Sequence, residues 1–353
     1  MDLKNIFSLY SDETPIDYQL IDNSHGNDDF RNTIITEYNN IKIVIKIANN
    51  KFTTIDKVEN IYHIINSLNE TMYYHPSIIL NRNNNVCEEV YYNNKSCVVY
   101  AEEYSKYKTA EQLGIVNCEN KMIIYHNEAI KYIGLTSSLH LSESKYPGYL
   151  SIFETIYNDK DCDEVKETAL ICKQILDESD ELKECFNKIW ILFINNEKRL
   201  KTMINKLPIS TFQSDMNTSN VLLDDSLSFK GMLDFNCSGT IPCIVYMFRE
   251  FFINFNENVI DDDENNIFFN ENINEIEFNT FIYNLKLASK YYKFSSIEIK
   301  TMGYLYRYLR PFWWNTVYIL RKHKNDFCKI KKVLDWLYNE LTRSIDFKAI
   351  INN

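Results

Sequence analysis

Three oxygen-bearing side chains lie near one another along the chain, at positions 215, 220 and 234. Asp215 ends an apolar approach, Asn220 follows five residues later, and Asp234 ends a second apolar run after a turn. Polar groups at the tips of short β elements are typical of catalytic loops held by a rigid frame. Phosphoryl transfer requires a carboxylate that orients or deprotonates the acceptor hydroxyl, and oxygen ligands that hold Mg²⁺. We therefore predict Asp215 as the catalytic base, and Asn220 and Asp234 as metal ligands.

A turn in which Asp and Asn bond their own backbone is the simpler explanation for any one of these residues taken alone. The complete array of two carboxylates and one amide around two apolar strands favours a site instead. A Ser–His–Asp hydrolase is the rival enzyme class, but its G-x-S-x-G elbow does not occur in the sequence.

This segment resembles the aminoglycoside phosphotransferase family, which shares a kinase-like fold with choline kinases, methylthioribose kinases and one type of homoserine kinase. The resemblance implies transfer of a nucleotide γ-phosphate to a hydroxyl group of a small molecule. It is carried by the following residues: Gln213-Ser214-Asp215, Asn220, Val221-Leu222-Leu223-Asp224 and Gly231-Met232-Leu233-Asp234-Phe235.

Three positions depart from the family pattern. Gln213 stands where the family usually has His, Ser214 where it usually has Gly, and Asn236 where Gly commonly follows Asp-Phe. The family His is expected to brace the catalytic loop by hydrogen bonds, and the amide of Gln213 can do the same. We expect these departures to bear on the substrate class more than on the chemistry, because the three oxygen donors are retained.

A phosphotransferase also needs a cation on the nucleotide phosphates, aimed by a carboxylate. Lys46 lies well inside the alternating run 41–48, on the same face as Val44, which would line an adenine pocket. Glu59 lies 13 residues after Lys46 on a predicted helix, where its charge would keep the lysine ionised and aimed. The alternative is a solvated lysine and a solvated helix glutamate, both of which are common.

Two other segments are expected to approach the nucleotide. Two β-rich runs, 32–38 and 41–48, around the polar pair 39–40 predict a β-hairpin. The loop 22–30 precedes this hairpin and contains a single glycine, so that the backbone amides of Ser24 and Gly26 could approach phosphates. Its acidic residues weaken this interpretation. Glu103 and Tyr104 should run beside the adenine at the junction of the two lobes, where backbone groups would make the pairing.

The periodicity of the apolar residues predicts a two-lobed, kinase-like α+β fold. The first hundred residues indicate strands and one helix, and from about Ala110 the pattern is helical except for a strand-rich insert at 209–234. Helices are predicted near 121–140, 146–157, 163–177 and 180–204, and the acidic, Asn-rich stretch around 261–266 is predicted to be a solvated loop. We expect a small antiparallel β-sheet lobe over 1–104, which clamps the nucleotide, and a larger helical lobe over 105–353, which carries the catalytic loop and the acceptor site.

Composition limits the choice of partners. The chain has 45% hydrophobic residues, enough for a large core, and a formal net charge of −11, which disfavours binding to nucleic acid. No secretory signal and no membrane-spanning stretch are recognisable. Nine scattered cysteines without a C-x-x-C pair are typical of reduced thiols, so we expect a cytoplasmic protein.

The predicted reaction is a Mg²⁺-dependent transfer of phosphate from ATP or GTP to an aminoglycoside-like, choline-like or homoserine-like acceptor. The net negative charge favours a cationic acceptor through electrostatic steering. The aromatic residues between 304 and 318 could hold such an acceptor, although core packing is their more common role. An inactive nucleotide-binding or scaffolding protein of the same fold is the alternative, motivated by Gln213, Asn236 and the glycine-poor loop. A protein kinase is disfavoured, because no A-P-E sequence follows Asp234.

Overall fold

The computed structural model describes residues 3–26, 28–38, 40–71, 73–153, 164–252 and 263–352. The chain forms two compact units. The first contains residues 1–128, 141–146 and 213–239, and the second contains 129–140, 147–212 and 240–353. The predicted boundary near residue 104 thus lies inside the first unit, which also includes the segment 213–239 with its three oxygen donors.

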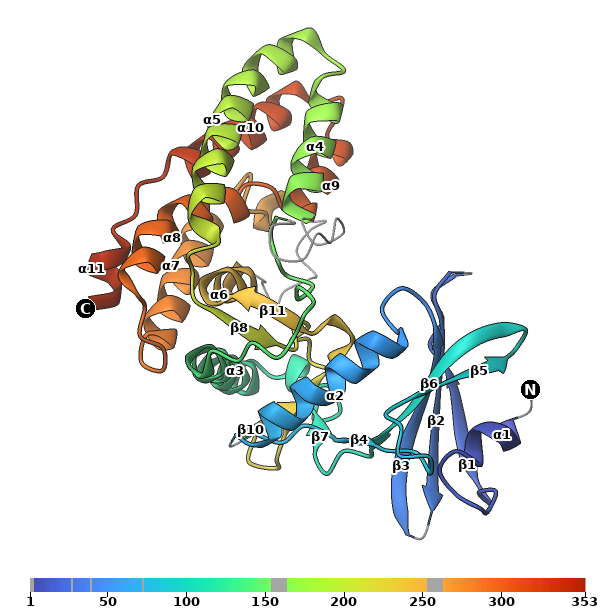
Figure 1. The fold of residues 1–353 in the computed structure, drawn as a ribbon. Helices are drawn as coiled ribbons and strands as arrows, with labels where there is room; N and C mark the ends of the chain where they lie inside the picture. The colour runs from blue at the N-terminus through green and yellow to red at the C-terminus, as the bar shows by residue number, and fades with distance from the viewer. Residues whose placement is uncertain are drawn as a thin grey trace. The chain divides into compact units, whose positions relative to one another are not determined.

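An antiparallel sheet dominates the first unit (Figure 1). Its strands follow the order β1-β2-β3-β6-β4, and β5 pairs with β6. The predicted hairpin is confirmed, since β2 and β3 pair from Tyr38 opposite Ile41 to Phe30 opposite Asn49. The strands are β1 (Tyr18–Asp22), β2 (Phe30–Tyr38), β3 (Ile41–Asn49), β4 (Ile78–Ile79), β5 (Glu88–Tyr92) and β6 (Lys95–Glu103).

The two faces of this sheet differ in chemistry. Alternate residues of β3, namely Ile43, Ile45 and Ile47, are buried in a core with Ile6 and Phe7 of helix α1 (Leu3–Phe7). The intervening residues point to the opposite face, because successive side chains alternate along a strand. Helix α2 (Ile55–Asn69) lies on the other side of the sheet from α1 (Figure 1). The sheet therefore has one apolar face and one face on which polar groups can gather.

A small three-stranded sheet contains the two strands that lie between Asn220 and Asp234 in the chain. It consists of β7 (Lys108–Thr109), β9 (Val221–Leu223) and β10 (Phe229–Met232), in the order β10-β9-β7. All three residues of β9 are buried. Gly231 of β10 forms a bridge with Tyr74, and a Cβ atom at Gly231 would lie only 1.5 Å from the carbonyl oxygen of Tyr74. Glycine is therefore required for this close approach of two backbones.

Helices dominate the second unit. The predicted helix near 146–157 is wrong over 146–153, which are not helical, and its remaining residues lie outside the described ranges. Strands β8 (Ile209–Phe212) and β11 (Gly239–Pro242) pair with each other. Helix α3 (Glu119–Leu139) begins in the first unit and ends in the second. The other helices are α4 (Glu164–Leu176), α5 (Asp180–Ile204), α6 (Cys243–Phe252), α7 (Glu271–Ala288), α8 (Ser296–Leu309), α9 (Trp314–Lys322), α10 (Phe327–Thr342) and α11 (Phe347–Asn352), with short 3₁₀ turns η1 (Ile115–Asn117), η3 (Phe235–Cys237) and η5 (Asp263–Asn265).

Aromatic residues form much of the core of the second unit. The ring of Phe193 on α5 stacks on Tyr308 of α8 with centroids 5.3 Å apart, and it meets Phe312 at 4.7 Å. Tyr308 and Phe312 are fully buried, whereas Trp314 and Tyr318 are exposed. The aromatic segment 304–318 is thus divided between core packing and the surface.

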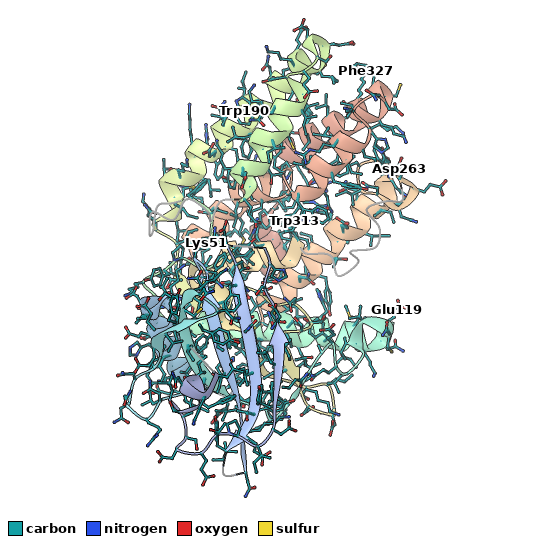
Figure 2. All side chains as sticks on the ribbon, turned by 90° about the vertical axis from the view of Figure 1, so that its right-hand side faces the viewer. Lys51, Glu119, Trp190, Asp263, Trp313 and Phe327 are labelled. Atoms are coloured by element: carbon teal, nitrogen blue, oxygen red, sulfur yellow. The ribbon has the colours of Figure 1, made fainter. Side chains whose placement is uncertain are left out.

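The acidic segment predicted to be a solvated loop is only partly described. Asp261 and Asp262 lie outside the described residues, and Asp263 opens η5 (Figure 2). The Asp263 carboxylate accepts hydrogen bonds from Lys322, His323 and Lys329. This part of the segment is therefore tied to the end of α9 and the start of α10. No helix among the described residues is long and apolar enough to cross a membrane.

Candidate active site

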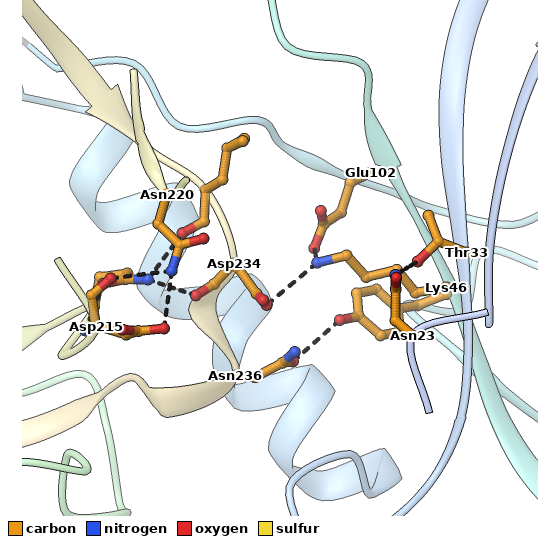
Figure 3. A network of polar contacts seen from close by, with 11 residues as sticks. Asn23, Thr33, Lys46, Glu102, Asp215, Asn220, Asp234 and Asn236 are labelled. Atoms are coloured by element: carbon orange, nitrogen blue, oxygen red, sulfur yellow. Dashed lines mark hydrogen bonds and ion pairs between the residues drawn. The ribbon is translucent and has the colours of Figure 1, made fainter. Parts of the chain in front are cut away.

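Lys46 meets two carboxylates on the polar face of the large sheet. Its Nζ lies 3.0 Å from Glu102 Oε1 and 3.5 Å from Asp234 Oδ1 (Figure 3). Register explains the first contact, because Lys46 on β3 is directly opposite Tyr100 on β6, and Val44 is opposite Glu102. Side chains of directly opposed residues share one face of a sheet. Lys46, Val44, Tyr100 and Glu102 therefore lie together.

The charges of this cluster stabilise one another. Burial by itself would lower the pKa of Lys46, but the attraction of Glu102, Tyr100 and Asp234 outweighs it and raises that pKa well above the usual value. Burial raises the pKa of Glu102, with a further contribution from Asp234, while Lys46 acts in the opposite direction. The lysine is thus held as a cation, with 19% of its side chain exposed, which suits a phosphate contact.

The acidic partner of Lys46 differs from the one expected. Glu59 was predicted to aim Lys46 from α2, but it is exposed on that helix beside the buried Val58. The acids in contact with Lys46 are Glu102, from the neighbouring strand, and Asp234. The physical reason is that the α2 stripe centred on Val58 turns toward the core, which leaves the next residue on the solvent side.

Gln213 braces the loop around Asp215 by hydrogen bonds, as predicted for its amide. Its Nε2 donates to the carbonyl oxygens of Leu233 at 2.9 Å and of Asp234 at 2.6 Å. Its Oε1 accepts from the backbone N–H of Asp215 at 2.7 Å. One buried side chain therefore joins the backbone of Asp215 to the backbone at Leu233 and Asp234.

Asp215 and Asn220 are in direct contact, as Figure 3 shows. Asn220 Nδ2 donates to Asp215 Oδ2 at 2.9 Å and to the Asp215 carbonyl oxygen at 3.0 Å. Asn217 Nδ2 donates to the other carboxylate oxygen at 3.0 Å. Burial raises the pKa of Asp215 and the charge of Asp234 adds to this, while the hydrogen bonds from Asn217 and Asn220 oppose it. The carboxylate is held in one orientation with its proton affinity increased, which suits a general base.

Two residues of the loop adopt the left-handed backbone region. Ser214 has φ 68°, and Asp234 has φ 53°. A residue with a Cβ is disfavoured there by about 1–2 kcal/mol, which explains why glycine is usual at position 214 in the family that the sequence resembles. Such strain is commonly found at functional sites, where the surrounding contacts maintain it.

The predicted metal ligands offer a suitable donor set. The amide nitrogen of Asn220 faces Asp215, so its oxygen points away from that carboxylate. The side chain of Asp234 is 41% exposed. One carboxylate and one amide oxygen suit a hard cation such as Mg²⁺, which takes its remaining ligands from phosphate and water. No group of three His, Cys, Asp or Glu side chains that could hold a metal occurs among the described residues.

The loop after β1 is closed by its own hydrogen bonds. The N–H of Ser24 donates to Asp22 Oδ1 at 3.0 Å, and the Ser24 hydroxyl accepts from the N–H of Arg31 at 3.0 Å. Gly26 has φ 77°. Asn23 Nδ2 donates to Thr33 Oγ1 at 3.2 Å, and Thr33 is opposite Lys46 in the sheet. The loop is anchored beside Lys46, but the Ser24 amide is already engaged inside it.

Glu103 and Tyr104, predicted to run beside the adenine, also use their amides within the protein. The N–H of Glu103 donates to the carbonyl oxygen of Ser77 at 2.9 Å, and the N–H of Tyr104 donates to the carbonyl oxygen of Lys42 at 3.2 Å. Lys42 Nζ lies 3.9 Å from the centroid of the Tyr104 ring. Any pairing with a base would thus have to use other groups of these two residues.

Tyr100 and Glu102 are neighbours of Lys46 that no local sequence pattern identifies. Tyr100 is fully buried, and its hydroxyl donates to Asn236 Oδ1 at 3.3 Å (Figure 3). The alternation along 95–103 does place Tyr100 and Glu102 on one face. However, only the pairing of β6 with β3 brings that face to Lys46.

The second unit contains a cavity of about 310 Å³. Arg249 of α6, which is 3% exposed, donates to Glu164 Oε2 at 2.8 Å and lies 5.2 Å from the centroid of Trp313. The charges on the wall are two carboxylates and one guanidinium, so its net charge is negative. The wall is formed by Glu164, Val165, Glu167, Thr168, Ile171, Arg249, Phe312, Trp313 and Trp314.

Comparison with known proteins gives no sequence relative, since no family model and no curated protein sequence match the chain. Solved structures do match. An amicoumacin kinase, hAmiN, in complex with AMP-PNP, Ca²⁺ and Ami, is 11% identical, covers 98% of this chain and 95% of its own, and has a TM-score of 0.52. The chain has a kinase-like phosphotransferase fold. The predicted fold class is therefore confirmed.

Two further structures of this kinase-like fold have similar coverage. A microcompartment-associated aminopropanol kinase is 10% identical, with 96% of this chain and 94% of that chain covered and a TM-score of 0.49. An ethanolamine kinase from Plasmodium vivax is 14% identical, with 99% and 87% covered and a TM-score of 0.44.

Proposed function

We propose that this protein transfers the γ-phosphate of a nucleotide to a hydroxyl group of a small molecule. The observation that carries the proposal is the 3.5 Å contact between Lys46 Nζ and Asp234 Oδ1. It joins a phosphate-binding cation to a metal ligand across 188 positions of sequence. An Asp–Asn pair beside the metal ligand completes the groups that phosphoryl transfer requires.

Each residue has a distinct role in this proposal. Asp215 orients the acceptor hydroxyl and accepts its proton, and Gln213 and Asn220 hold its backbone and carboxylate in place. Lys46, aimed by Glu102, binds the nucleotide phosphates. Asn220 Oδ1 and the Asp234 carboxylate would hold Mg²⁺, which when bound neutralises charge on the phosphates. Val44 lies on the same sheet face as Lys46 and lines the base-binding side.

We propose ATP as the phosphate donor. The amicoumacin kinase with the same fold contains the adenine nucleotide analogue AMP-PNP and a divalent cation, Ca²⁺. The kinase-like fold together with Lys46 and Asp234 is consistent with a nucleotide bound through a divalent metal. GTP in place of ATP is an outcome that a direct comparison of the two nucleotides would reveal.

The cavity of the second unit is our candidate for acceptor recognition. Aromatic faces and carboxylates together attract organic cations. Trp314 and Glu167 supply both, while Trp313 and Glu164 already contact the guanidinium of Arg249. We therefore propose that the acceptor is a small alcohol that carries a protonated amine. The net charge of −11 favours the same class through steering.

Nucleotide turnover across a panel of amino alcohols, amino sugars and hydroxy amino acids tests the proposal. We expect transfer that requires Mg²⁺ and is lost in Asp215→Ala. Asp225→Ala, which changes an exposed aspartate in the turn after β9, serves as the matched control and should retain activity. Turnover that survives Asp215→Ala would reject the assigned base. Tight nucleotide binding without transfer to any acceptor would favour a scaffolding protein.

A further inference from the structure

Tyr100 on β6 contacts both Lys46 and Asn236, which lies two residues after Asp234; Figure 3 labels Lys46, Asp234 and Asn236. Lys46 Nζ lies 5.6 Å from the centroid of its ring, and its hydroxyl donates to Asn236 Oδ1 at 3.3 Å. Tyr100 is directly opposite Lys46 in the β3–β6 ladder, so the sheet fixes the position of the ring. One buried side chain therefore touches both the phosphate-binding lysine and the metal-ligand segment.

Asn236 supplies the other half of this contact. It lies two residues after Asp234, in the 3₁₀ turn Phe235–Cys237. Glycine is common at this position in the family that the sequence resembles, and a glycine would offer no side chain to Tyr100. One of the three departures from the family pattern thus creates a hydrogen-bonded link from the turn to the sheet.

The segment needs such restraints because its backbone is strained. Asp234 adopts φ 53° and ψ 79°, outside the regions that a residue with a Cβ prefers. Gln213 restrains the segment at the carbonyl oxygens of Leu233 and Asp234. The ring of Phe235 packs edge-on against His75 with centroids 5.2 Å apart. The Tyr100–Asn236 hydrogen bond restrains the segment from β6, the strand that pairs with the Lys46 strand β3.

We propose that Tyr100 and Asn236 are positioning residues, whose hydrogen bond fixes the orientation in which Asp234 presents its carboxylate to the metal and to Lys46. This inference rests on the proposed function. Neither residue touches the reacting atoms in this account. Tyr100 acts through Lys46 and Asn236, and Asn236 acts through the backbone of Asp234. Loss of the bond should weaken metal-dependent nucleotide binding without unfolding the protein.

Tyr100→Phe, Asn236→Gly and the double variant test the inference in the full-length chain. Tyr100→Phe keeps the ring and removes only the hydroxyl, and Asn236→Gly introduces the residue common in the family. Tyr91→Phe, which alters an exposed tyrosine on β5, is the matched control. Thermal unfolding of each variant verifies that the fold is retained.

The first readout needs no metal or nucleotide. Hydrogen–deuterium exchange of the backbone amides in 233–238 should be faster in Tyr100→Phe and in Asn236→Gly than in the wild type, and unchanged in Tyr91→Phe. The second readout is calorimetric titration of ATP at several Mg²⁺ concentrations. The Mg²⁺ concentration that gives half-maximal ATP binding should rise about threefold to tenfold in each single variant, as expected for one lost neutral hydrogen bond.

The double variant provides the sharpest criterion. If the two residues act through one bond, the exchange rates and the half-maximal Mg²⁺ concentration of the double variant should equal those of either single variant. Independent residues would instead give the product of the two single effects. Unchanged exchange in 233–238, or multiplied effects, would overturn the inference. Wild-type protein that binds ATP only with Mg²⁺, together with variants that bind it equally well, would overturn the inference and leave the proposed function standing. Wild-type protein that binds no ATP would reject the proposed function, while the exchange rates would still decide whether the bond holds the segment.

Discussion

Lys46 and Glu102 form an ion pair across two neighbouring strands of one sheet, with Nζ and Oε1 3.0 Å apart. In the general kinase arrangement the lysine on the third strand is paired with a glutamate on the following helix. Here the carboxylate projects from β6 instead, so the position of Lys46 depends on the register of the sheet and not on the position of α2.

Glu102→Gln should therefore impair the protein far more than Glu59→Gln does. The change removes the charge that best holds Lys46 as a cation aimed at the phosphates, and we expect kcat/KM for ATP to fall about tenfold or more. Glu59→Gln is the matched control and should change kcat/KM by less than twofold, since Glu59 is exposed on α2. The opposite ranking in steady-state kinetics would show that the helix glutamate is the functional partner.

Much of this site could be predicted from the sequence because its spacing is local. Asp215, Asn220 and Asp234 are held by a loop, two short strands and a turn whose residues are close in the chain. Lys46 stands out because Ile43, Ile45 and Ile47 alternate with it along one strand. Such periodicity is encoded within a few residues and does not depend on the rest of the fold.

The contacts that could not be predicted join distant parts of the chain. Glu102 and Tyr100 reach Lys46 only through the pairing of β6 with β3, and a shift of that register by one residue would turn both side chains to the opposite face. Tyr100 reaches Asn236 across 136 positions of sequence. No local pattern determines such long-range contacts. Glu59, on the helix that follows Lys46, was therefore predicted as the acidic partner, whereas the partner in the structure is Glu102.

Gln213→Leu tests whether Gln213 holds the loop around Asp215 by its hydrogen bonds or only by filling space. Leucine keeps roughly the volume of the side chain but leaves the carbonyl oxygens of Leu233 and Asp234, and the N–H of Asp215, without their partner. Three lost hydrogen bonds at about 1 kcal/mol each should lower the free energy of unfolding by roughly 2–3 kcal/mol. We also expect kcat to fall by a larger factor than KM rises, because Asp215 and Asp234 are no longer held at a fixed distance and orientation by the side chain of Gln213. Urea denaturation and steady-state kinetics measure the two effects, and a variant with wild-type kcat would exclude Gln213 as a brace.

The pH dependence of turnover reports on Asp215. A base must be unprotonated to act, and burial and Asp234 raise the pKa of Asp215. Activity should therefore fall on the acid side at a pH above the usual range of an aspartate. Asn217→Ala removes a hydrogen bond that stabilises the carboxylate and should move this acid limb to still higher pH. An acid limb of kcat/KM that stays in place in Asn217→Ala would show that another group controls it.

Gly231→Ala should be among the most destabilising substitutions in the first unit. The new Cβ would lie 1.5 Å from the carbonyl oxygen of Tyr74, so β10 and the segment at Tyr74 would have to separate. We expect a loss of about 3–5 kcal/mol in the free energy of unfolding, the size of effect produced by severe steric conflict in a packed interior. Gly114→Ala has open space around the new Cβ and only an unfavourable φ of 64°, and should cost about 1–2 kcal/mol. Equal losses in chemical denaturation would contradict the close approach of the two backbones.

Trp314→Ala tests whether the cavity of the second unit recognises the acceptor. The Trp314 side chain is 52% exposed and lines the cavity together with Glu164 and Glu167. A cation over an aromatic face gains about 0.5–2 kcal/mol, so KM for an amine-bearing acceptor should rise about twofold to thirtyfold with little change in kcat. A neutral alcohol acceptor should be affected much less, because the lost attraction depends on charge. Ile276→Ala removes an exposed apolar side chain of α7 that is not part of the cavity wall and serves as the control. An equal rise in KM for charged and neutral acceptors would mean that the tryptophan contributes packing and does not select a cation.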